Sequence, residues 1–456
     1  MKKNSLIASP FKLLVASSLA LIVTNAYSQT PSQEELANKL DQLTDELAKV
    51  KAQLKQMQEQ QATTQTAPPA ASPPPGAAQP SGTTASAVAA DNGTSRASEP
   101  ATVLFSYGEL NYNRPTKQTQ DTQFDLHRFV LGFQHRFDET TKVVTELEVE
   151  HAVASRDDNG EVEVEQAYVE RMLNQTWSAQ GGLFLIPAGL LNEKHEPTHY
   201  YGVERNFVET AIIPSTWREG GLQIIGNFDN GLKWQSGVST GFNLNKWDAG
   251  SEDGVGEGAK SPLGAVHQEL QFAKSHDLSF FTALNWRGIP GLQLGGSIFS
   301  GNSTQALAVT TARVTLWDLH ARWTPGRWDF AALYARGTIS NTAALNVQYI
   351  GSPTLIPKSF DGWYAQAAYQ LWTHNDYVLT PFIRYEQFNT ARTFADLGPG
   401  LTPDPTKTEK VVTVGANLQV SPGVVLKADY QRFHPNDDAN RPDLANRIDL
   451  GLGWSF

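Results

Sequence analysis

The sequence predicts an all-β fold, a transmembrane antiparallel β-barrel of about 16 strands preceded by a short α-helical coiled coil. In residues 447–456 large apolar side chains alternate with polar or very small ones, and the segment ends on Phe456. Such period-two alternation indicates a strand with one apolar and one hydrated face. The same alternation recurs throughout residues 101–456. Beyond residue 25 no run of about 18 apolar residues occurs, which excludes helical membrane spans.

The N-terminus has the features of a secretory signal peptide, which we assign to residues 1–28. Three lysines precede the apolar run 13–23, and Ala26-Tyr27-Ser28 offers small residues for cleavage. The alternative is an uncleaved anchor helix, which the shortness of the apolar run disfavours. Cysteine is absent, which excludes disulfides, cysteine-ligated metals and a lipoprotein anchor.

Two further segments precede the predicted barrel. Residues 29–60 are assigned to a periplasmic coiled coil, because apolar side chains recur there at steps of four and three. The heptad positions are filled by Leu36, Leu40, Leu43, Leu47, Val50, Leu54 and Met57. The alternative is a lone amphipathic helix on a protein surface. Residues 61–100 form a Pro/Ala-rich linker with too few large apolar groups to fold.

The barrel domain, residues 101–456, is predicted from its connections as well as its strands. Brief turns are expected at Asp138-Glu139, Asn174-Gln175, Asp229-Asn230-Gly231, Pro290-Gly291, Pro325-Gly326, Thr373-His374-Asn375 and Ser421-Pro422-Gly423. Between them lie long polar stretches at 187–219, 244–266, 341–360, 391–408 and 435–445. Short turns at one rim and long loops at the other are typical of outer-membrane barrels.

The alternative fold is a soluble β-sandwich or propeller. Tryptophans near strand ends disfavour it, because a membrane interface places aromatic side chains there. The tryptophans concerned are Trp234, Trp286, Trp323, Trp363 and Trp454. An even number of strands puts both ends of the barrel on one side, so the N-terminal helix is expected in the periplasm, beside Phe456.

No residue pattern predicts catalysis. The segment His195-Glu196-Pro197-Thr198-His199 matches the H-E-x-x-H zinc motif, but a proline inside it prevents the helix that the motif requires. The glycines at 254, 256 and 258 lack a surrounding strand–helix unit. We therefore expect no enzyme, no metal and no cofactor. The net charge of -11 argues against nucleic acid as a partner.

The residues expected to matter are the charges that face the lumen. If the apolar residues of each strand face lipid, the residues that alternate with them face the lumen. Five glutamates on two neighbouring strands then form an acidic wall, and bases are spread over other strands. The segment 187–219 is longer than a hairpin needs and, as the third long loop, either folds inward as a constriction or covers the mouth. The candidates for pore lining and constriction are Arg128, Arg136, Glu146, Glu148, Glu150, Glu163, Glu165, Lys194, Arg205, Arg218, Arg287, Arg322, Arg336 and Arg384. Further inward bases are Lys233, Lys427 and Arg447. The alternative is a polar wall without selectivity.

Several segments resemble the phosphate-selective porin O/P family. They are 124–137, 146–169 with the turn Asp158-Asn159-Gly160, and 189–221. Within the last, the resemblance rests on Asn192-Glu193, His195-Glu196-Pro197, Gly202-Val203-Glu204-Arg205 and Ile213-Pro214-Ser215-Thr216-Trp217-Arg218-Glu219.

This resemblance implies a trimer of sixteen-stranded barrels with an inward-folded third loop. It also implies, for phosphate-selective members, a ladder of arginines and a ring of lysines leading to the constriction. The present sequence departs from the family there, since no strand carries Arg or Lys at successive inward positions. The N-terminal helix resembles the periplasmic coiled coils of some sugar porins.

The sequence thus predicts a porin of the bacterial outer membrane that forms a water-filled channel for passive diffusion of small hydrophilic solutes or ions. The expected partners are outer-membrane lipid, a homotrimer of the same chain, and peptidoglycan through the coiled coil. One alternative is a phosphate- or anion-selective channel of the same fold. Another is a structural tether in which the coiled coil links the barrel to the cell wall.

Overall fold

The computed structural model describes residues 101–155, 158, 160–250, 256–308, 310–434 and 444–456. The predicted signal peptide, coiled coil and linker lie outside the described residues. All described residues belong to one compact unit, Thr83–Phe456. Among them, no helix combines the length and apolar character that crossing a membrane would need.

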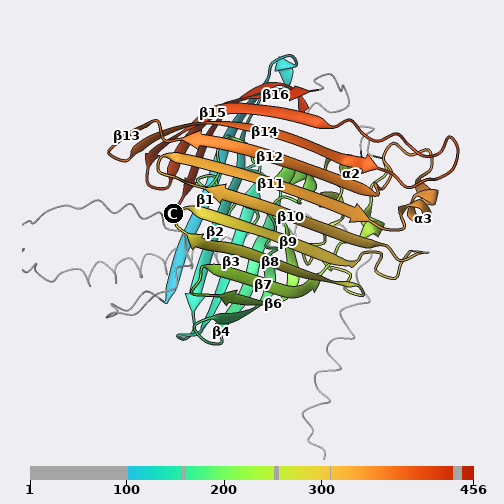
Figure 1. Cartoon of the computed structure of the whole chain (residues 1–456), viewed down its shortest axis with the longest axis horizontal. Coiled ribbons are helices and arrows are strands. Elements are labelled where there is room, and N and C mark those ends of the chain that lie inside the picture. The colour runs from blue at the N-terminus through green and yellow to red at the C-terminus, as the bar shows by residue number, and fades with distance from the viewer. Residues whose placement is uncertain (1–100, 156–157, 159, 251–255, 309, 435–443) are drawn as a thin grey trace, which may run out of the picture. The chain divides into compact units, whose positions relative to one another are not determined.

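The described residues form a closed antiparallel barrel (Figure 1). Its strands are β1 (Thr102–Pro115), β2 (Gln123–Arg136), β3 (Thr141–Glu150), β4 (Val162–Met172), β5 (Trp177–Leu185), β6 (Arg218–Asn227), β7 (Leu232–Thr240), β8 (Leu278–Ile289), β9 (Leu292–Asn302), β10 (Arg313–Trp323), β11 (Trp328–Ile339), β12 (Ser359–Tyr369), β13 (Trp372–His374), β14 (Tyr377–Thr393), β15 (Glu409–Ser421), β16 (Val424–His434) and β17 (Arg447–Ser455). Apart from β12 and β13, which both pair with β14, strands next to each other in sequence pair, and β1 closes the ring by pairing with both β2 and β17.

The number of crossings confirms the predicted barrel. Strands β12 and β13 both pair with β14 and are two parts of one crossing, so the 17 strands make 16 crossings. The helices are short. They are η2 (Thr119–Asp121), the π-helix η3 (Val208–Ile212), η4 (Leu244–Lys246), α2 (Glu257–Lys260), η5 (Gly264–Val266), α3 (Thr342–Asn346) and η6 (Val347–Tyr349).

Strand β16 shows why the sequence folds this way. Its side chains alternate between buried and exposed along almost the whole strand. Lys427 and Asp429 are 4% and 5% exposed, whereas Leu426 and Tyr430 are 43% and 40% exposed. In the middle of the strand, charged groups face inward and apolar groups outward, the reverse of a water-soluble protein. This order is stable where hydrocarbon surrounds the barrel and polar groups meet inside it.

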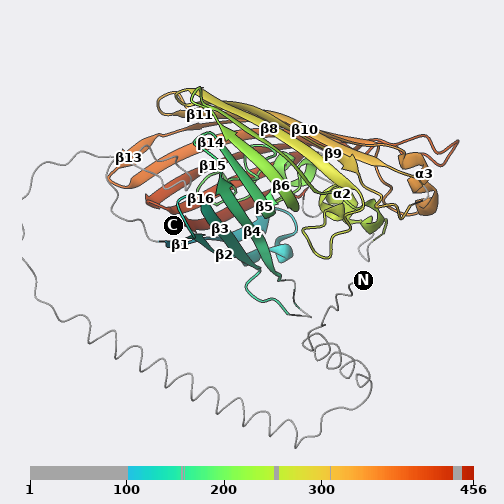
Figure 2. The same cartoon turned by 90° about the horizontal axis from the view of Figure 1, so that it is seen from below.

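The two ends of the barrel differ in their connections. The short-turn end carries the connections 137–140, 173–176, 228–231, 290–291, 324–327, 375–376 and 422–423. The long-loop end carries the other connections, and α2 and α3 lie there (Figures 1 and 2). The backbone N–H of Ser106 donates to the carbonyl of Phe456 (3.1 Å). The start of β1 and the end of β17 therefore meet at the short-turn end.

Side chains at the short-turn end fit turns and a membrane interface. The Asp138 carboxylate accepts hydrogen bonds from the backbone N–H groups of Thr140 (2.7 Å) and Thr141 (2.8 Å) and so closes the first turn. Trp177 packs edge to face on Trp234, with ring centroids 5.5 Å apart. Tryptophans at this depth are typical of an interfacial girdle.

Two local expectations need correction. The turn expected at 373–375 lies at 375–376, because Thr373 and His374 extend the hairpin by pairing with Val378 and Tyr377. Trp363 was expected near a strand end, but it lies within β12.

We expect the outer face of β16 to respond to charge according to depth. Ala428 is exposed near the middle of the strand, so Ala428→Arg should lower the free energy of unfolding by about 2–4 kcal/mol, because it places a guanidinium in hydrocarbon. Val424→Arg puts the same charge at the first residue of β16, where the expected loss is about 0–1 kcal/mol. Urea unfolding in lipid vesicles measures both, and equal losses would contradict the assigned depth.

Candidate functional site in the barrel lumen

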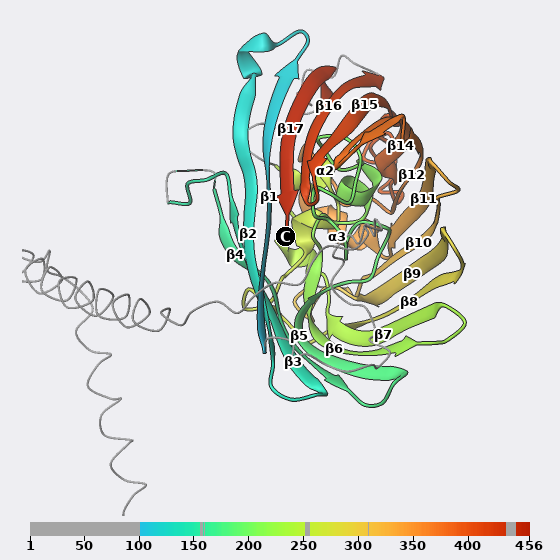
Figure 3. The same ribbon diagram turned by 90° about the vertical axis from the view of Figure 1, so that its left-hand side faces the viewer.

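The connection between β5 and β6, residues 186–217, folds into the barrel; we call it the lumen segment. Figure 3 looks along the barrel from the short-turn end, and the segment, drawn in green, lies within the ring of strands. Its residues bond to strands around the ring. The Tyr201 hydroxyl donates to Asp329 of β11 (3.2 Å), and the backbone N–H of Val203 donates to Asp429 of β16 (2.7 Å). Of the two placements left open by the sequence, the structure shows the inward one.

Apolar packing holds one side of the lumen segment. Trp217 is fully buried between Phe242, with ring centroids 5.1 Å apart, and Phe299, at 4.6 Å. Phe207 stacks on Phe388 of β14 at 5.3 Å. The strands from β8 to β14 supply further inward apolar side chains to this cluster, among them Phe281, Val314, Leu316, Leu333 and Phe360. On this side the inward-facing side chains therefore form a packing surface. The alternation of residues alone predicted a polar pore lining there.

Two side chains satisfy backbone groups that the lumen segment would otherwise bury unpaired. The Asn192 amide donates to the carbonyls of Ile186 (2.7 Å) and Trp217 (2.8 Å) and accepts from the Trp217 N–H (2.7 Å). It thereby joins the two ends of the segment. The Glu209 carboxylate accepts from the N–H groups of Leu190 (2.5 Å) and Leu191 (2.7 Å). A loop can be buried only when its backbone polar groups are paired in this way.

A polar network joins the other side of the segment to β1, β2 and β4. His195 Nε2 lies 2.5 Å from Glu165 Oε1, and the Tyr107 hydroxyl donates to the same carboxylate (2.6 Å). Arg128 Nε donates to Glu109 (2.7 Å), whose other oxygen accepts from the Tyr200 hydroxyl (2.6 Å).

The segment containing the H-E-x-x-H match is a turn and not a helix. His195 contacts the barrel wall, whereas His199 Nδ1 lies 2.6 Å from Glu196. The two histidines do not converge.

The expected acidic wall is present on β3 and β4, but it is covered. Glu148 lies directly opposite Glu163 in the register, and a register shift after Glu146 makes Glu165 an extra residue of β4. Glu146, Glu148 and Glu165 are 8%, 2% and 0% exposed. Glu165 is paired with His195, and among the described residues no base pairs with Glu146 or Glu148. Glu150 ends β3 and is partly exposed.

Arg218, predicted to line the pore, has the outward parity of its strand. It begins β6 on the same parity as the outward Leu222, at the point where β5 has ended. Its guanidinium pairs with Glu163 and with Glu269 (3.1 Å). Burial would raise the pKa of Glu269, which lies in a long loop, but the His267 ring 2.9 Å away and Arg218 outweigh burial, so this pKa lies below its ordinary value.

Arg336 also needs correction. It pairs in register with Asp361 and shares the parity of Tyr334, which packs outside against Trp317. Parity counting from the sequence placed Arg336 inward, but in β11 the inward positions are those of Leu333 and its alternate neighbours.

The other predicted bases are inward but do not form a ladder. Arg384 is 2% exposed and donates to Glu386 (2.8 Å). Arg205 donates to the Thr216 hydroxyl (3.0 Å). The bases that reach solvent lie near the short turns, and we call them the basic rim: Arg136, Lys194, Lys233, Arg287 and Arg322. Within it, Arg322 pairs with Asp329 (2.6 Å) and Lys233 with Glu193 (3.4 Å).

Sequence reasoning missed several members of the site. Tyr107, Glu109, Asp329 and Glu386 all occupy inward positions of strands, so the alternation of their strands could have found them. Asp125, His127 and His151 come together at the long-loop end. In the sequence, only the spacing of Asp125 and His127 within one strand indicated this cluster.

A cavity of about 390 Å³ also lies at the long-loop end. It is lined by Thr210, Pro214, Ser215, Asp248, Glu257, Lys260, Ser261, Gly264, Ala265 and His267.

The chain was compared with family models, with known protein sequences and with solved structures. No family model matches the chain. An uncharacterized protein of Aquifex aeolicus is 30% identical over 336 residues, which are 72% of this chain and 74% of that protein. The chain belongs to the same family as this protein.

Among solved structures, OmpF of Salmonella typhi, in complex with daunomycin, superposes with a TM-score of 0.54 at 14% identity, covering 78% of this chain and 97% of that chain. The outer-membrane channel DcaP of Acinetobacter baumannii gives a TM-score of 0.48 at 12% identity, covering 78% and 97%. The likeness to OmpF shows that this chain has the same barrel fold.

We expect Asn192→Ala to loosen the lumen segment without opening the barrel. Three backbone groups lose their partner, at about 1–3 kcal/mol for each group left unpaired. Amide hydrogen exchange within 186–217 should therefore accelerate at least about tenfold. The control is Asn174→Ala, which removes bonds to Thr176 (2.9 Å) and Trp177 (3.0 Å) at a short turn. Unchanged exchange in the segment of Asn192→Ala would contradict the role of this amide.

Proposed function

We propose that the chain is an outer-membrane porin that lets small hydrophilic solutes or ions diffuse through its lumen. The observation that carries this proposal is the barrel of 16 crossings with apolar groups outside, charged groups inside and the lumen segment folded across its interior. An inward segment narrows a barrel of this size and leaves the charges around it to act on solutes. No step of covalent chemistry is part of the proposal.

The distribution of charge supports a further detail, a preference for anions. The carboxylates of the acidic wall are buried, with Glu148 2% and Glu165 0% exposed, and Glu165 is paired with His195 of the lumen segment. The basic rim reaches solvent, with the side chains of Lys233 and Arg322 37% and 39% exposed. Exposed charge acts on ions in the aqueous path more directly than buried charge. We infer that the basic rim attracts anions at the short-turn end, which would face the periplasm.

Assembly as a homotrimer in the outer membrane and a periplasmic position of residues 29–60 belong to the same proposal. Their support is the heptad pattern at 36–57 and the resemblance of the sequence to trimeric porins. Chemical cross-linking of the membrane-embedded protein tests the assembly. A ladder ending at the dimer would contradict it.

The selectivity can be tested on single channels in planar bilayers. The double variant Lys233→Gln, Arg287→Gln should shift the reversal potential in a KCl gradient towards cations, with a change of roughly twofold or more in the permeability ratio near 0.1 M salt, where the screening length is about 10 Å. The matched variant Glu148→Gln should change the ratio less, because this carboxylate is 2% exposed.

Two results would contradict these proposals. Purified, folded protein that forms no channels would refute the porin function itself. A larger shift in Glu148→Gln than in the double variant would refute control by the basic rim.

A further inference from the structure

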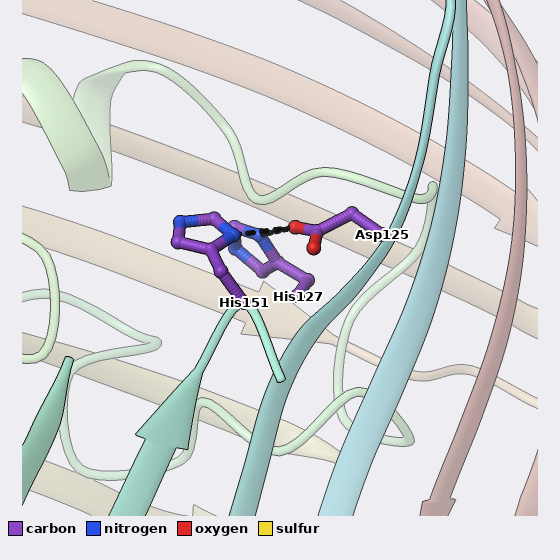
Figure 4. Close-up of side chains that lie close together, drawn as sticks. All are labelled: Asp125, His127 and His151. Atoms are coloured by element: carbon purple, nitrogen blue, oxygen red, sulfur yellow. Dashed lines mark hydrogen bonds and ion pairs between the residues drawn. The ribbon is translucent and has the colours of Figure 1, made fainter. Parts of the chain in front are cut away.

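Asp125, His127 and His151 come together on the lumen wall at the long-loop end. Asp125 and His127 lie near the start of β2, and His151 directly follows β3, the neighbouring strand. The register of β1 and β2 shifts between Glu109 and Leu110, which leaves His127 without a partner on β1. Such a bulge re-aims a side chain, and here the His127 ring lies beside that of His151, with both rings facing the Asp125 carboxylate (Figure 4).

The distances suit a shared ion. One ligand atom from each residue can be chosen so that all three lie within 4.8 Å of one another. Both histidines approach the same oxygen, Asp125 Oδ2, with His151 Nδ1 at 2.7 Å and His127 Nδ1 at 3.7 Å. Zinc bonds of about 2.0–2.1 Å in a tetrahedron separate the ligand atoms by roughly 3.3 Å. To hold zinc, the His151–Asp125 distance would have to open, and the His127–Asp125 distance to close, by about half an ångström each.

The backbone gives an independent indication. His151 has φ of 56° and Ala152 has φ of 59°, so two successive residues other than glycine adopt the left-handed region. Such conformations persist where the surrounding structure holds them, and they are concentrated at ligand sites. Here the unusual backbone directs the imidazole of His151 at Asp125.

The surrounding charge favours a cation. Asn111 lies opposite Asp125 in the register, and its amide donates to Glu204 of the lumen segment (3.4 Å). A second carboxylate thus lies across from the cluster. The nearest arginine on β2, Arg128, is taken up by Glu109 at 2.7 Å. The side chains of Asp125, His127 and His151 are 27%, 33% and 38% exposed, so an ion can enter from the aqueous side.

We propose that Asp125, His127 and His151 form a binding site for a divalent transition-metal cation such as Zn²⁺. Imidazole nitrogens suit zinc, copper and nickel, whereas magnesium and calcium prefer sites made of oxygen alone. Three protein ligands leave further coordination positions to water or to an anion in the lumen. The site does not depend on the proposed porin function.

The test is isothermal titration of Zn²⁺ into the full-length protein, purified in detergent with a tag that contains no histidine. We expect one Zn²⁺ per chain and no competition from a tenfold excess of Mg²⁺. His151→Ala and Asp125→Asn should each weaken binding at least about tenfold. The matched control is His135→Ala, a histidine of the same strand whose ring bonds to Thr102 near the short-turn end, and it should bind Zn²⁺ as the wild type does.

Absence of saturable Zn²⁺ binding to the folded wild type would overturn the site, as would an equal loss in His135→Ala. If His151→Ala does not fold, Asp125→Asn and His127→Gln decide, because neither changes the strained backbone at residue 151. Channel recordings separate the two proposals. A protein that conducts but binds no Zn²⁺ refutes the metal site alone, and one that binds Zn²⁺ but forms no channel refutes the porin function alone.

Discussion

An irregular backbone can lie at membrane depth only where protein groups or the water of a cavity satisfy its N–H and C=O groups, and the rest of this structure depends on how that condition is met. The lumen segment has 32 residues between Leu185 and Arg218 without a strand of its own. The carboxylates of Glu209, Asp429 and Glu386 accept hydrogen bonds from its backbone. The inward charges of the barrel therefore have a structural task before they can have any effect on a solute.

This task changes how the lumen charges are understood. A carboxylate that holds the segment is buried and paired, and it contributes little to the field in the aqueous path. Glu165 is the clearest case, since it is fully buried against His195 and Tyr107. Bases of the basic rim remain in contact with water, as the exposed side chains of Lys233 and Arg322 show. The exposed bases and the buried carboxylates thus differ in their contact with water, whereas the sequence predicts an acidic wall with bases spread over the other strands.

Strand alternation made the fold predictable, because each strand records in its own residues which face meets lipid. The site was predictable only in part. The members Glu146, Glu148 and Glu165 follow from the parity of β3 and β4, and Arg128 follows from β2. The position of Arg336 could not be predicted from its strand alone. The register of β11 and β12 pairs it with Asp361 on the outer face. Nor did the partners of these charges follow, because His195 meets Glu165 only after 186–217 has folded inward.

The sequence by itself determined the barrel, its number of crossings and the difference between its two ends, since these depend on local periodicity and on the lengths of connections. Only the tertiary structure decided where the lumen segment lies and which charges it covers. It also brought His151 to Asp125 and His127. These features arise from contacts between residues far apart in the chain, and such contacts leave no period in the sequence.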